Sequence, residues 1–346
     1  MKHYVGLDVS LKETAICVVD ENGVVIREGK ALSEPEAIGA WLNESGLPIV
    51  KIGIEIGGLA RWLYSELRAA GLHAVCIDPR RLRGVTKTMP IKTDRNDARA
   101  IAQVMRVGWY TVVHIKGDVS QELRMLLNNR KTLLIKQIDI ENEIRGVLRV
   151  FGLKLSGRIP QATFEQQTNE LTDGHPRLAA MLRPMLVARA ALREQYGVLH
   201  KMVLEIVRRE PTCQRLMTIP GVGALTAITF LTTIDDPDRF QRSRDVGAHL
   251  GLTPRKYASG ETDRNGAISR CGDVMLRTIL YQAACTSNPH QALVRIESLG
   301  CKGGQATRPS PSGRSSRTKI SDRDASDLGR WKRVPMDPRG GDRMIN

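Results

Sequence analysis

The order of apolar patterns in residues 3–78 restricts the fold more than any other feature of this sequence. Three strand-like runs come first, and the turn-forming Glu21-Asn22-Gly23 joins the second run to the third as in a hairpin. Helix, strand, helix and strand patterns then alternate. The elements are expected, in order, at 3–9, 13–20, 23–32, 34–46, 51–58, 59–70 and 73–78. Strands followed by alternating helices and strands predict an α/β layer built on a mixed sheet.

A different period begins near residue 120. Across 120–151 and again across 176–209, apolar residues recur at steps of three and four, which predicts two long helices. The polar stretch between them, 154–175, has no clear period. Narrow apolar stripes are typical of an antiparallel helical pair or coiled coil, so we expect a long helical hairpin that also offers a surface for self-association.

The segment 216–234 contains a Pro-Gly-Val-Gly turn between two short helical patterns. This arrangement resembles a helix–hairpin–helix, whose exposed backbone N–H groups can contact a phosphate. The alternative is a tight connection between two helices with no ligand.

Beyond Ile296 the sequence becomes rich in Arg, Ser, Gly and Pro and loses its apolar period. This composition predicts disorder, and the segment is then either a basic arm for nucleic acid or a dangling tail. The expected domains are an α/β unit at 1–115, a helical assembly region at 116–208, a mainly α unit at 209–296 and a basic tail at 297–346.

The overall charge restricts the partner. The chain has 346 residues, enough for two or three domains, and a net charge of +15, which favours a polyanion because Lys and Arg displace counterions from phosphates. A membrane surface is the competing polyanion. No apolar run reaches about 18–20 residues and the start lacks a signal peptide, so we expect nucleic acid rather than membrane and a cytoplasmic location.

Residue counts exclude other kinds of site. The six cysteines form no CxxC pair and no Cys/His cluster at zinc spacing, so we interpret them as reduced thiols. Aromatic residues make up only 4% of the chain, which argues against the stacking platforms of single-strand binders.

Four carboxylates stand out in the α/β part. Asp8 ends the first strand, Glu55 lies inside the fourth between two isoleucines, and Asp94 and Asp97 stand three apart at the start of a helix. Local roles are possible, because Asp94 could be an N-cap with Asp97 in the first turn, and Asp8 could merely end a strand. Glu55 is harder to explain locally, since a carboxylate in a buried strand is costly without a partner.

Convergence of the four carboxylates at one sheet edge would give them a shared role. Like charges a few ångströms apart raise each other's pKa, and one or two Mg²⁺ ions resolve the conflict. Two such ions can stabilise both oxygens of an in-line phosphoryl displacement. Arg95 and Arg99 would then face DNA phosphate.

A second candidate centre is Ser259, which precedes a glycine in a loop full of cations. The cations are Arg255, Lys256, Arg264, Arg270 and Arg277. A hydroxyl among cations is what attack on a phosphodiester requires, namely a nucleophile with positive charge on the non-bridging oxygens. A Ser-Gly pair is also a common turn signal, so an ordinary loop remains the alternative.

Together these segments resemble a known family. The blocks GLDVS, IGIEIGG, IDP, IKTDRNDARAIA, IPGVG and GLTPRKYASGETDRNGAISRCGDVMLRTILYQAA occur in the order seen in insertion-sequence-110-type transposases, which include Piv-like DNA invertases. The resemblance extends from about residue 3 to residue 289. It implies a RuvC-like (RNase H-type) domain, a helical assembly region and a C-terminal transposase domain.

The resemblance also implies the chemistry. The acidic tetrad of the family falls on Asp8, Glu55, Asp94 and Asp97, and the nucleophile falls on Ser259. Many relatives have two serines before the glycine, whereas this chain has Ala258-Ser259. Members need Mg²⁺, recombine DNA as oligomers guided by a structured RNA, and are thought to form a phosphoserine link. A site composed from different protomers of a dimer or tetramer is the family expectation.

The end of the chain departs from this family, because low-complexity sequence replaces basic, apolar helical sequence after Ile296. A shifted reading frame or a decayed element is our hypothesis, and it would put activity of this copy in doubt. Other functions are a RuvC-like nuclease that uses metal-activated water, a non-catalytic nucleic-acid-binding protein, and an actin-like-fold kinase. A kinase of that fold would need a second Gly-rich phosphate loop, which is not evident.

Overall fold

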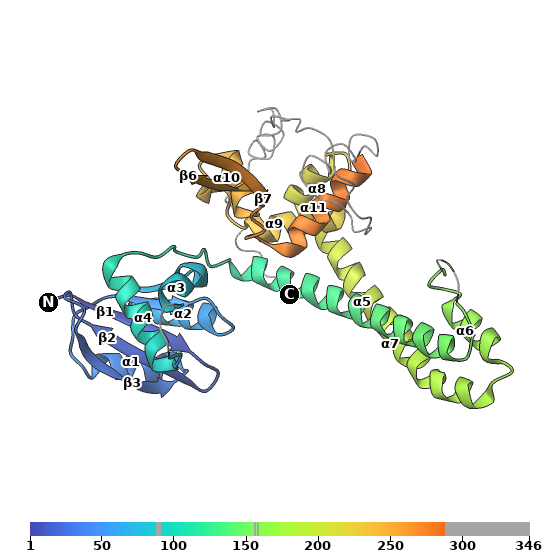
Figure 1. The fold of residues 1–346 in the computed structure, drawn as a ribbon, viewed down its shortest axis with the longest axis horizontal. Coiled ribbons are helices and arrows are strands. Elements are labelled where there is room, and N and C mark those ends of the chain that lie inside the picture. The colour runs from blue at the N-terminus through green and yellow to red at the C-terminus, as the bar shows by residue number, and fades with distance from the viewer. Residues whose placement is uncertain (88–90, 156, 158, 288–346) are drawn as a thin grey trace. The chain divides into compact units, whose positions relative to one another are not determined.

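The computed structural model describes residues 1–87, 91–155, 157 and 159–287. The chain divides into two compact units, Met1–Ile115 and the part that begins at Lys116 (Figure 1). The basic tail expected at 297–346 lies outside the described residues. Within the described ranges, no helix combines the length and apolar character needed to cross a membrane.

The first unit contains a five-stranded sheet in the order β3-β2-β1-β4-β5. The strands are β1 (His3–Val9), β2 (Glu13–Val19), β3 (Val25–Leu32), β4 (Ile49–Glu55) and β5 (Ala74–Ile77). β2 is antiparallel to both of its neighbours, whereas β1, β4 and β5 run parallel. The expected mixed sheet is therefore confirmed. The fourth strand starts and ends earlier than expected, and Glu55 is its last residue rather than an interior one, because Gly57 and Gly58 follow as a bend and turn before the next helix.

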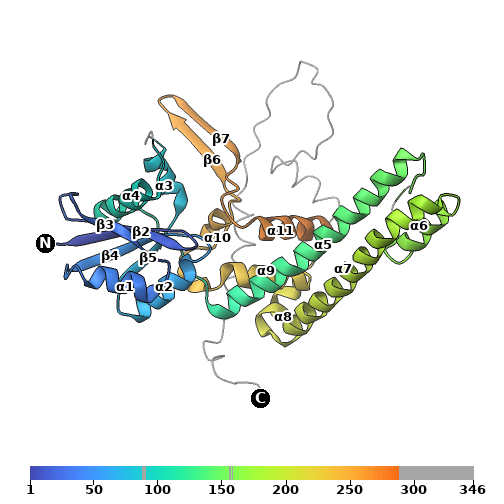
Figure 2. The same ribbon diagram turned by 90° about the horizontal axis from the view of Figure 1, so that it is seen from below.

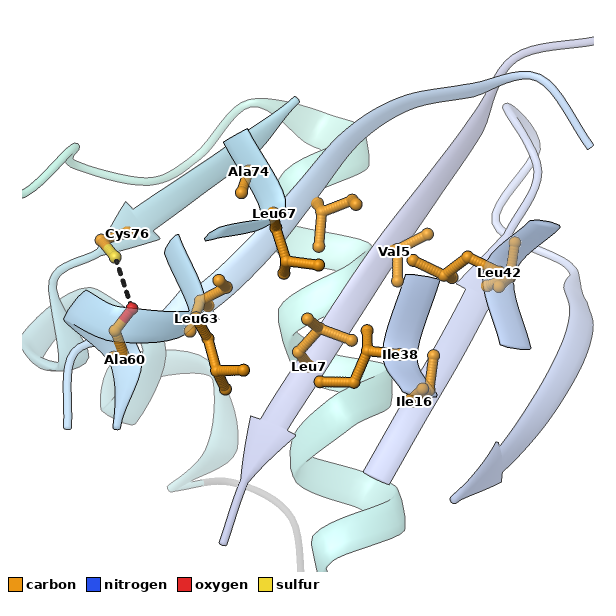
Figure 3. Packing of buried hydrophobic residues seen from close by; sticks show 13 residues of the cluster. Val5, Leu7, Ile16, Ile38, Leu42, Ala60, Leu63, Leu67, Ala74 and Cys76 are labelled. Atoms are coloured by element: carbon orange, nitrogen blue, oxygen red, sulfur yellow. Dashed lines mark hydrogen bonds between the residues drawn. The ribbon is translucent and has the colours of Figure 1, made fainter. Parts of the chain in front are cut away.

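Helices cover both faces of this sheet. The helices of this unit are α1 (Pro35–Asn43), α2 (Ala60–Ala69), α3 (Pro79–Thr86) and α4 (Asp94–Val107). Figure 3 shows α1 and α2 contributing Ile38, Leu42, Leu63 and Leu67 to a cluster with the alternate strand residues, among them Leu7. α4 packs on the opposite face, against β1, β2 and β4. Side chains alternate along a strand, so one face of β1 fills the α1/α2 core and the other faces α4.

The second unit begins with a long antiparallel helical hairpin, visible in both views (Figures 1 and 2). It is formed by α5 (Asp118–Val150) and α7 (Pro176–Arg209). Leu127 near the start of α5 packs with Val203 near the end of α7. Leu148 near the end of α5 packs with Leu178 near the start of α7, which fixes the antiparallel direction. Two long helices were expected at these positions, and the structure confirms them.

The stretch 154–175 contains a helix that periodicity did not predict. α6 (Phe164–Thr172) packs against α7. Its buried stripe includes Thr168 and Thr172, whose hydroxyl groups donate to main-chain carbonyl oxygens one turn earlier in the helix. Because these polar side chains satisfy their hydrogen bonds internally, they can be buried without producing an apolar period.

The remaining elements of the second unit form a small mixed structure. They are α8 (Pro211–Met217), α9 (Ala224–Ile234), a short 3₁₀ helix (Pro237–Arg239), α10 (Ser243–His249), β6 (Pro254–Ser259), β7 (Thr262–Ile268) and α11 (Val274–Ser287). The Pro-Gly-Val-Gly turn at 220–223 separates α8 from α9, and Gly221 adopts a φ of +81° there. Both helices pack against the hairpin end through Cys213, Ala227 and Ile228.

Candidate active site

Asp8 and Glu55 lie on neighbouring parallel strands and on the same face of the sheet. The register pairs Gly6 with Gly53 and Leu7 with Ile54, so the next residue of each strand is a carboxylate. Residues two apart on a strand share a face, which places both carboxylates on the face that bears the paired glycines and α4. Asp8 and Glu55 are each partly buried.

The paired glycines let α4 lie directly on the sheet. A methyl group on Gly6 would collide with the carbonyl oxygen of Ala98 and the amide nitrogen of Ala102. A methyl group on Gly53 would collide with Met105 and Ile101. Glycine is required at both positions because backbone and helix approach so closely. This contact sets the height of α4 above the sheet.

The start of α4 brings the other two carboxylates to the same place. Thr93, not Asp94, is the N-cap, and its hydroxyl group accepts a hydrogen bond from the backbone N–H of Asn96. The capping role considered for Asp94 is therefore wrong, and Asp94 and Asp97 both lie in the first turn. They extend, at three- and four-residue steps, the stripe through which Ala98 packs on the sheet.

The pKa values show that the four carboxylates interact. Burial, followed by repulsion from Asp97, Asp94 and Glu55, raises the pKa of Asp8 to about 6, and Lys92 opposes the rise. The pKa of Glu55 is raised as well, chiefly by burial and further by Asp97, while Arg83 and Lys92 oppose the rise. Residues distant in the sequence therefore share one electrostatic environment at this edge of the sheet.

The chemistry of this acidic site, defined as Asp8, Glu55, Asp94 and Asp97, fits a hard divalent cation. Carboxylate oxygens are the preferred ligands of Mg²⁺ and Mn²⁺. A cation would also relieve the like-charge repulsion that raises the pKa of Asp8. Within the described part of the chain, no three His, Cys, Asp or Glu side chains already stand as a ready ligand set. The donor types are present, and the side chains would have to close on an ion.

Glu28 on β3 is a neighbour of the site that the sequence analysis missed. Arg95 Nε donates to Glu28 Oε2 at 2.6 Å, and Arg99 Nη2 donates to the same oxygen at 2.8 Å. The two arginines expected to face DNA phosphate thus pair with Glu28 in this structure, although Arg95 remains exposed. Nothing in the sequence could indicate this pairing, because about seventy residues separate the partners.

Ser259 lies in the second unit, at the end of β6. It pairs with Thr262 across a two-residue turn formed by Gly260 and Glu261, and it is exposed. Gly260 has a φ of +54°, the left-handed conformation that favours glycine at the first turn position of a two-residue hairpin loop. Ser259 therefore stands beside the tip of an exposed β-hairpin, not in an irregular loop as expected. Figure 2 shows this β6–β7 hairpin.

The two faces of this hairpin differ in charge. The register pairs Ser259 with Thr262 and Tyr257 with Arg264, so these side chains share one face. The guanidinium group of Arg264 lies over the Tyr257 ring, 5.3 Å from its centre. On the other face, Lys256 forms an ion pair with Asp263 at 3.1 Å and is thereby neutralised.

Two of the other three predicted cations contact the backbone around the hairpin base. Arg255 donates to the carbonyl oxygen of Ser269, and Arg277 donates to that of Leu250. Arg270 is exposed and has a φ of +57°. The hydrogen bonds of Arg255 and Arg277 thus connect the hairpin base to the rest of the unit.

Two family models match this chain. One, described as "Transposase IS116/IS110/IS902 family", matches residues 213–296. The other, described as "Transposase" and representing DEDD transposases of the IS110 type, matches residues 5–152. The first match includes Ser259, and the second includes the whole acidic site.

Several curated relatives are similar over most of the chain, and one over a shorter part. The transposase for insertion sequence element IS1111A of Coxiella burnetii is 29% identical over 287 residues, covering 81% of this chain and 76% of the relative. A probable family 20 transposase of Pseudomonas aeruginosa is 30% identical over 258 residues, covering 72% and 76%. The pilin gene-inverting protein of Moraxella lacunata is 34% identical over 70 residues, covering 20% and 22%. The chain therefore belongs to the IS110-type family of insertion-sequence transposases.

Proposed function

We propose that this chain is the DNA transposase of an insertion sequence and that it cleaves and exchanges DNA strands by phosphoryl transfer. The observation that carries the proposal is the electrostatic coupling of Asp8, Glu55, Asp94 and Asp97 at one sheet edge. Their order along the chain, Asp-Glu-Asp-Asp, is the DEDD order of the matching family. Acidic groups brought together from three separate segments indicate a site for chemistry rather than helix capping.

The first unit is proposed to be a RuvC-like, RNase H-type domain. The strand order 3-2-1-4-5 with an antiparallel second strand supports this assignment, as does the placement of the acidic site where the parallel strands β1 and β4 end. The four carboxylates are proposed to hold one or two Mg²⁺ ions. Bound there, Mg²⁺ would supply positive charge for the oxygens of the reacting phosphate.

Ser259 is proposed to be the nucleophile. Its Oγ would form a bond to phosphorus while the bond from phosphorus to one deoxyribose oxygen breaks, and the hydroxyl proton would leave as the departing oxygen gains one. One phosphodiester is thereby exchanged for another, so no high-energy cofactor is consumed. The guanidinium group of Arg264 on the same hairpin face supports this role, since it can neutralise a non-bridging oxygen.

The partners are proposed from the charge and from exposed apolar side chains. A net charge of +15 suits DNA together with a structured guide RNA, the latter resting on the family resemblance. Exposed apolar residues on the long helices favour a homo-oligomer, with the acidic site and Ser259 of one composite site supplied by different protomers. These residues include Ile135, Ile138, Val187, Val198 and Met202.

A strand-exchange assay with two active-site variants tests the proposal. The full-length protein, Mg²⁺ and DNA carrying the ends of its own element are incubated, and recombinant products and covalent protein–DNA adducts are measured. Glu55→Gln should abolish both products while DNA affinity remains. Ser259→Ala should abolish the adduct, whereas Ser269→Ala, a serine at the hairpin base, should leave it intact.

Two outcomes would contradict the proposal in different ways. DNA cleavage that survives Ser259→Ala would identify a nuclease that uses metal-activated water. Indifference to Glu55→Gln, with unchanged DNA binding, would identify a protein that only binds nucleic acid. A guide RNA is tested separately, by sequencing the RNA that copurifies with the protein.

A further inference from the structure

Glu28 connects an edge strand of the sheet to the helix that carries half of the acidic site. Its carboxylate accepts hydrogen bonds from Arg95 at 2.6 Å and from Arg99 at 2.8 Å. These arginines are four apart, one helical turn, and lie in the first two turns of α4. The Glu28 side chain is only 11% exposed, whereas the side chains of Arg99 and Arg95 are 39% and 68% exposed, so the carboxylate is the enclosed partner of the contact.

The surroundings of Glu28 require it to be ionised and paired. The register places it opposite Cys17 of β2, which is fully buried. The two guanidinium groups, Arg99 first, lower the pKa of Glu28 to about 2. Burial, followed by the charge of Glu28, raises the pKa of Cys17 to about 12. An enclosed carboxylate is costly to leave without its cations, so the contact resists movement of the start of α4.

The first half of α4 contacts the sheet through small residues, whereas the second half packs through the large buried side chains of Ile101 and Met105. Beneath the first half of the helix lies Gly6, and the helix presents Ala98 and Ala102 to the sheet there. Small residues allow close approach but interlock weakly, because few side-chain atoms project from either surface. A fixed point near the start of the helix and away from its axis would therefore set the position of its first two turns. Arg95 and Arg99 supply it.

We propose that Glu28 is a positioning residue of the acidic site: by holding Arg95 and Arg99 it fixes the first two turns of α4 and hence the placement of Asp94 and Asp97 relative to Asp8. Arg95 lies between the two aspartates in sequence, so a movement that releases it moves both carboxylates. The pairing also keeps two guanidinium groups on the β3 side of α4. This inference rests on the proposed function, because it assumes that the four carboxylates hold a divalent cation.

Mn²⁺ binding to the full-length protein tests the inference without an activity assay. Free Mn²⁺ is measured by electron paramagnetic resonance during a titration in the absence of DNA. Glu28→Gln should raise the dissociation constant for Mn²⁺ about 10-fold or more, the usual effect of removing a residue that orients metal ligands. The matched control is Glu13→Gln on β2, an exposed residue paired with Lys30 of β3 at 3.4 Å, which should leave Mn²⁺ affinity unchanged.

A second variant covers the case in which Glu28→Gln does not fold. Arg95→Gln changes a side chain that is 68% exposed, so the protein should still fold. It removes one of the two partners of Glu28 and leaves the carboxylate paired with Arg99. It should weaken Mn²⁺ binding by a smaller factor. Thermal unfolding of each variant in EDTA separates a loss of stability from a loss of ligand placement.

The outcomes distinguish this inference from the proposed function. If folded Glu28→Gln and Arg95→Gln proteins bind Mn²⁺ as tightly as the wild type, the positioning role is wrong, whatever happens to their stability. If wild-type Mn²⁺ binding is not weakened by Glu55→Gln, the proposed metal site itself is wrong. Weaker binding in both Glu28→Gln and Glu55→Gln, with Glu13→Gln unaffected, supports both.

Discussion

Two residues of β1, Asp8 and Gly6, show at the scale of single residues what the acidic site requires. Asp8 is partly buried and close to three other carboxylates, so its charged form is disfavoured and its pKa rises to about 6. Gly6 is two residues earlier on the same face and is too close to α4 to be replaced without a collision. The crowded charge of Asp8 favours binding of a cation, and the absence of a side chain at Gly6 allows α4 to approach the site.

Asp8→Asn should stabilise the protein in EDTA at neutral pH while abolishing recombination. Above pH 6 the wild type carries the cost of an ionised Asp8, and below about pH 4 the carboxyl group is neutral in both folded and unfolded states. The gain should therefore be absent at pH 4, grow through the window up to 6 and be complete above it. After solvent screening we expect about 1 kcal/mol, or roughly 4 °C in melting temperature.

Melting curves of both proteins at pH 4, 5, 6 and 7.5 measure this dependence. Adding Mg²⁺ should stabilise the wild type more than Asp8→Asn and so reduce the difference. A variant that is less stable than the wild type at pH 7.5 in EDTA would show that the carboxylate has a favourable partner instead.

Gly6→Ala should destabilise the first unit by about 1–3 kcal/mol, the usual cost of forcing an extra methyl group into a packed contact. The added group meets backbone atoms of α4, which cannot move aside as a flexible side chain can. Denaturant unfolding followed by tryptophan fluorescence reports on this unit, which contains Trp41, Trp62 and Trp109.

Gly39→Ala is the matched control. Gly39 lies inside α1 and has open space where a methyl group would be added. It should stabilise the same unit by about 0.5–1 kcal/mol, since alanine favours a helix over glycine. Equal effects of the two substitutions would contradict the close approach of α4 to β1.

Among the elements, the β6–β7 hairpin has two faces of different charge. The face of Ser259 carries Arg264 with its guanidinium group against an aromatic ring, and the opposite face carries Lys256 paired with Asp263. The residues of β6 are all exposed, so none of them packs in a core and their side chains are accessible to a partner. The faces should therefore differ in function although both carry cations.

Arg264→Ala should slow formation of the covalent Ser259 adduct by about 10²-fold, the usual cost of removing one group that stabilises charge in the transition state. Lys256→Ala, which removes a cation already neutralised by Asp263, should change the rate by less than about 3-fold. Single-turnover adduct formation measured on denaturing gels compares the two. Similar losses in both variants would show that the hairpin contributes only general positive charge.

The whole molecule combines a large positive charge with a small, strongly acidic centre. A net charge of +15 favours polyanions without sequence preference, whereas the four carboxylates of the acidic site would repel a phosphate unless cations accompany it. DNA binding should therefore depend on the monovalent salt concentration, and the reaction at the acidic site on divalent cations.

DNA affinity should fall steeply with monovalent salt, by about 10³-fold or more between 50 and 200 mM if six or more phosphates are contacted. Fluorescence anisotropy with a labelled duplex measures the slope of log K against log [salt]. Glu55→Gln should leave the slope unchanged, because it adds no phosphate contact. A shallow slope would contradict binding dominated by Lys and Arg.

Local sequence was sufficient for the strands of the first unit and for the two long helices, and it singled out the four carboxylates as candidates. Periods of two and of three to four residues predicted the strands and the long helices, because these patterns depend on near neighbours. The same patterns failed for α6, which lies in a polar stretch. Its buried threonines donate their hydroxyl hydrogen bonds to carbonyl oxygens of the same helix, so no apolar period marks it. The patterns also misplaced Glu55 within its strand and the cap of α4, since two glycines and a threonine decided those boundaries.

Only the tertiary structure decided how the acidic residues meet and what holds them. The pairing of Gly6 with Gly53, the approach of α4 and the hold of Glu28 on Arg95 and Arg99 join segments far apart in the chain. Such contacts depend on strand register and helix placement, which are set by burying the whole core and leave no local pattern. The sequence by itself determined which groups are available for chemistry, and the packing of one helix on two glycines determined that they share a site.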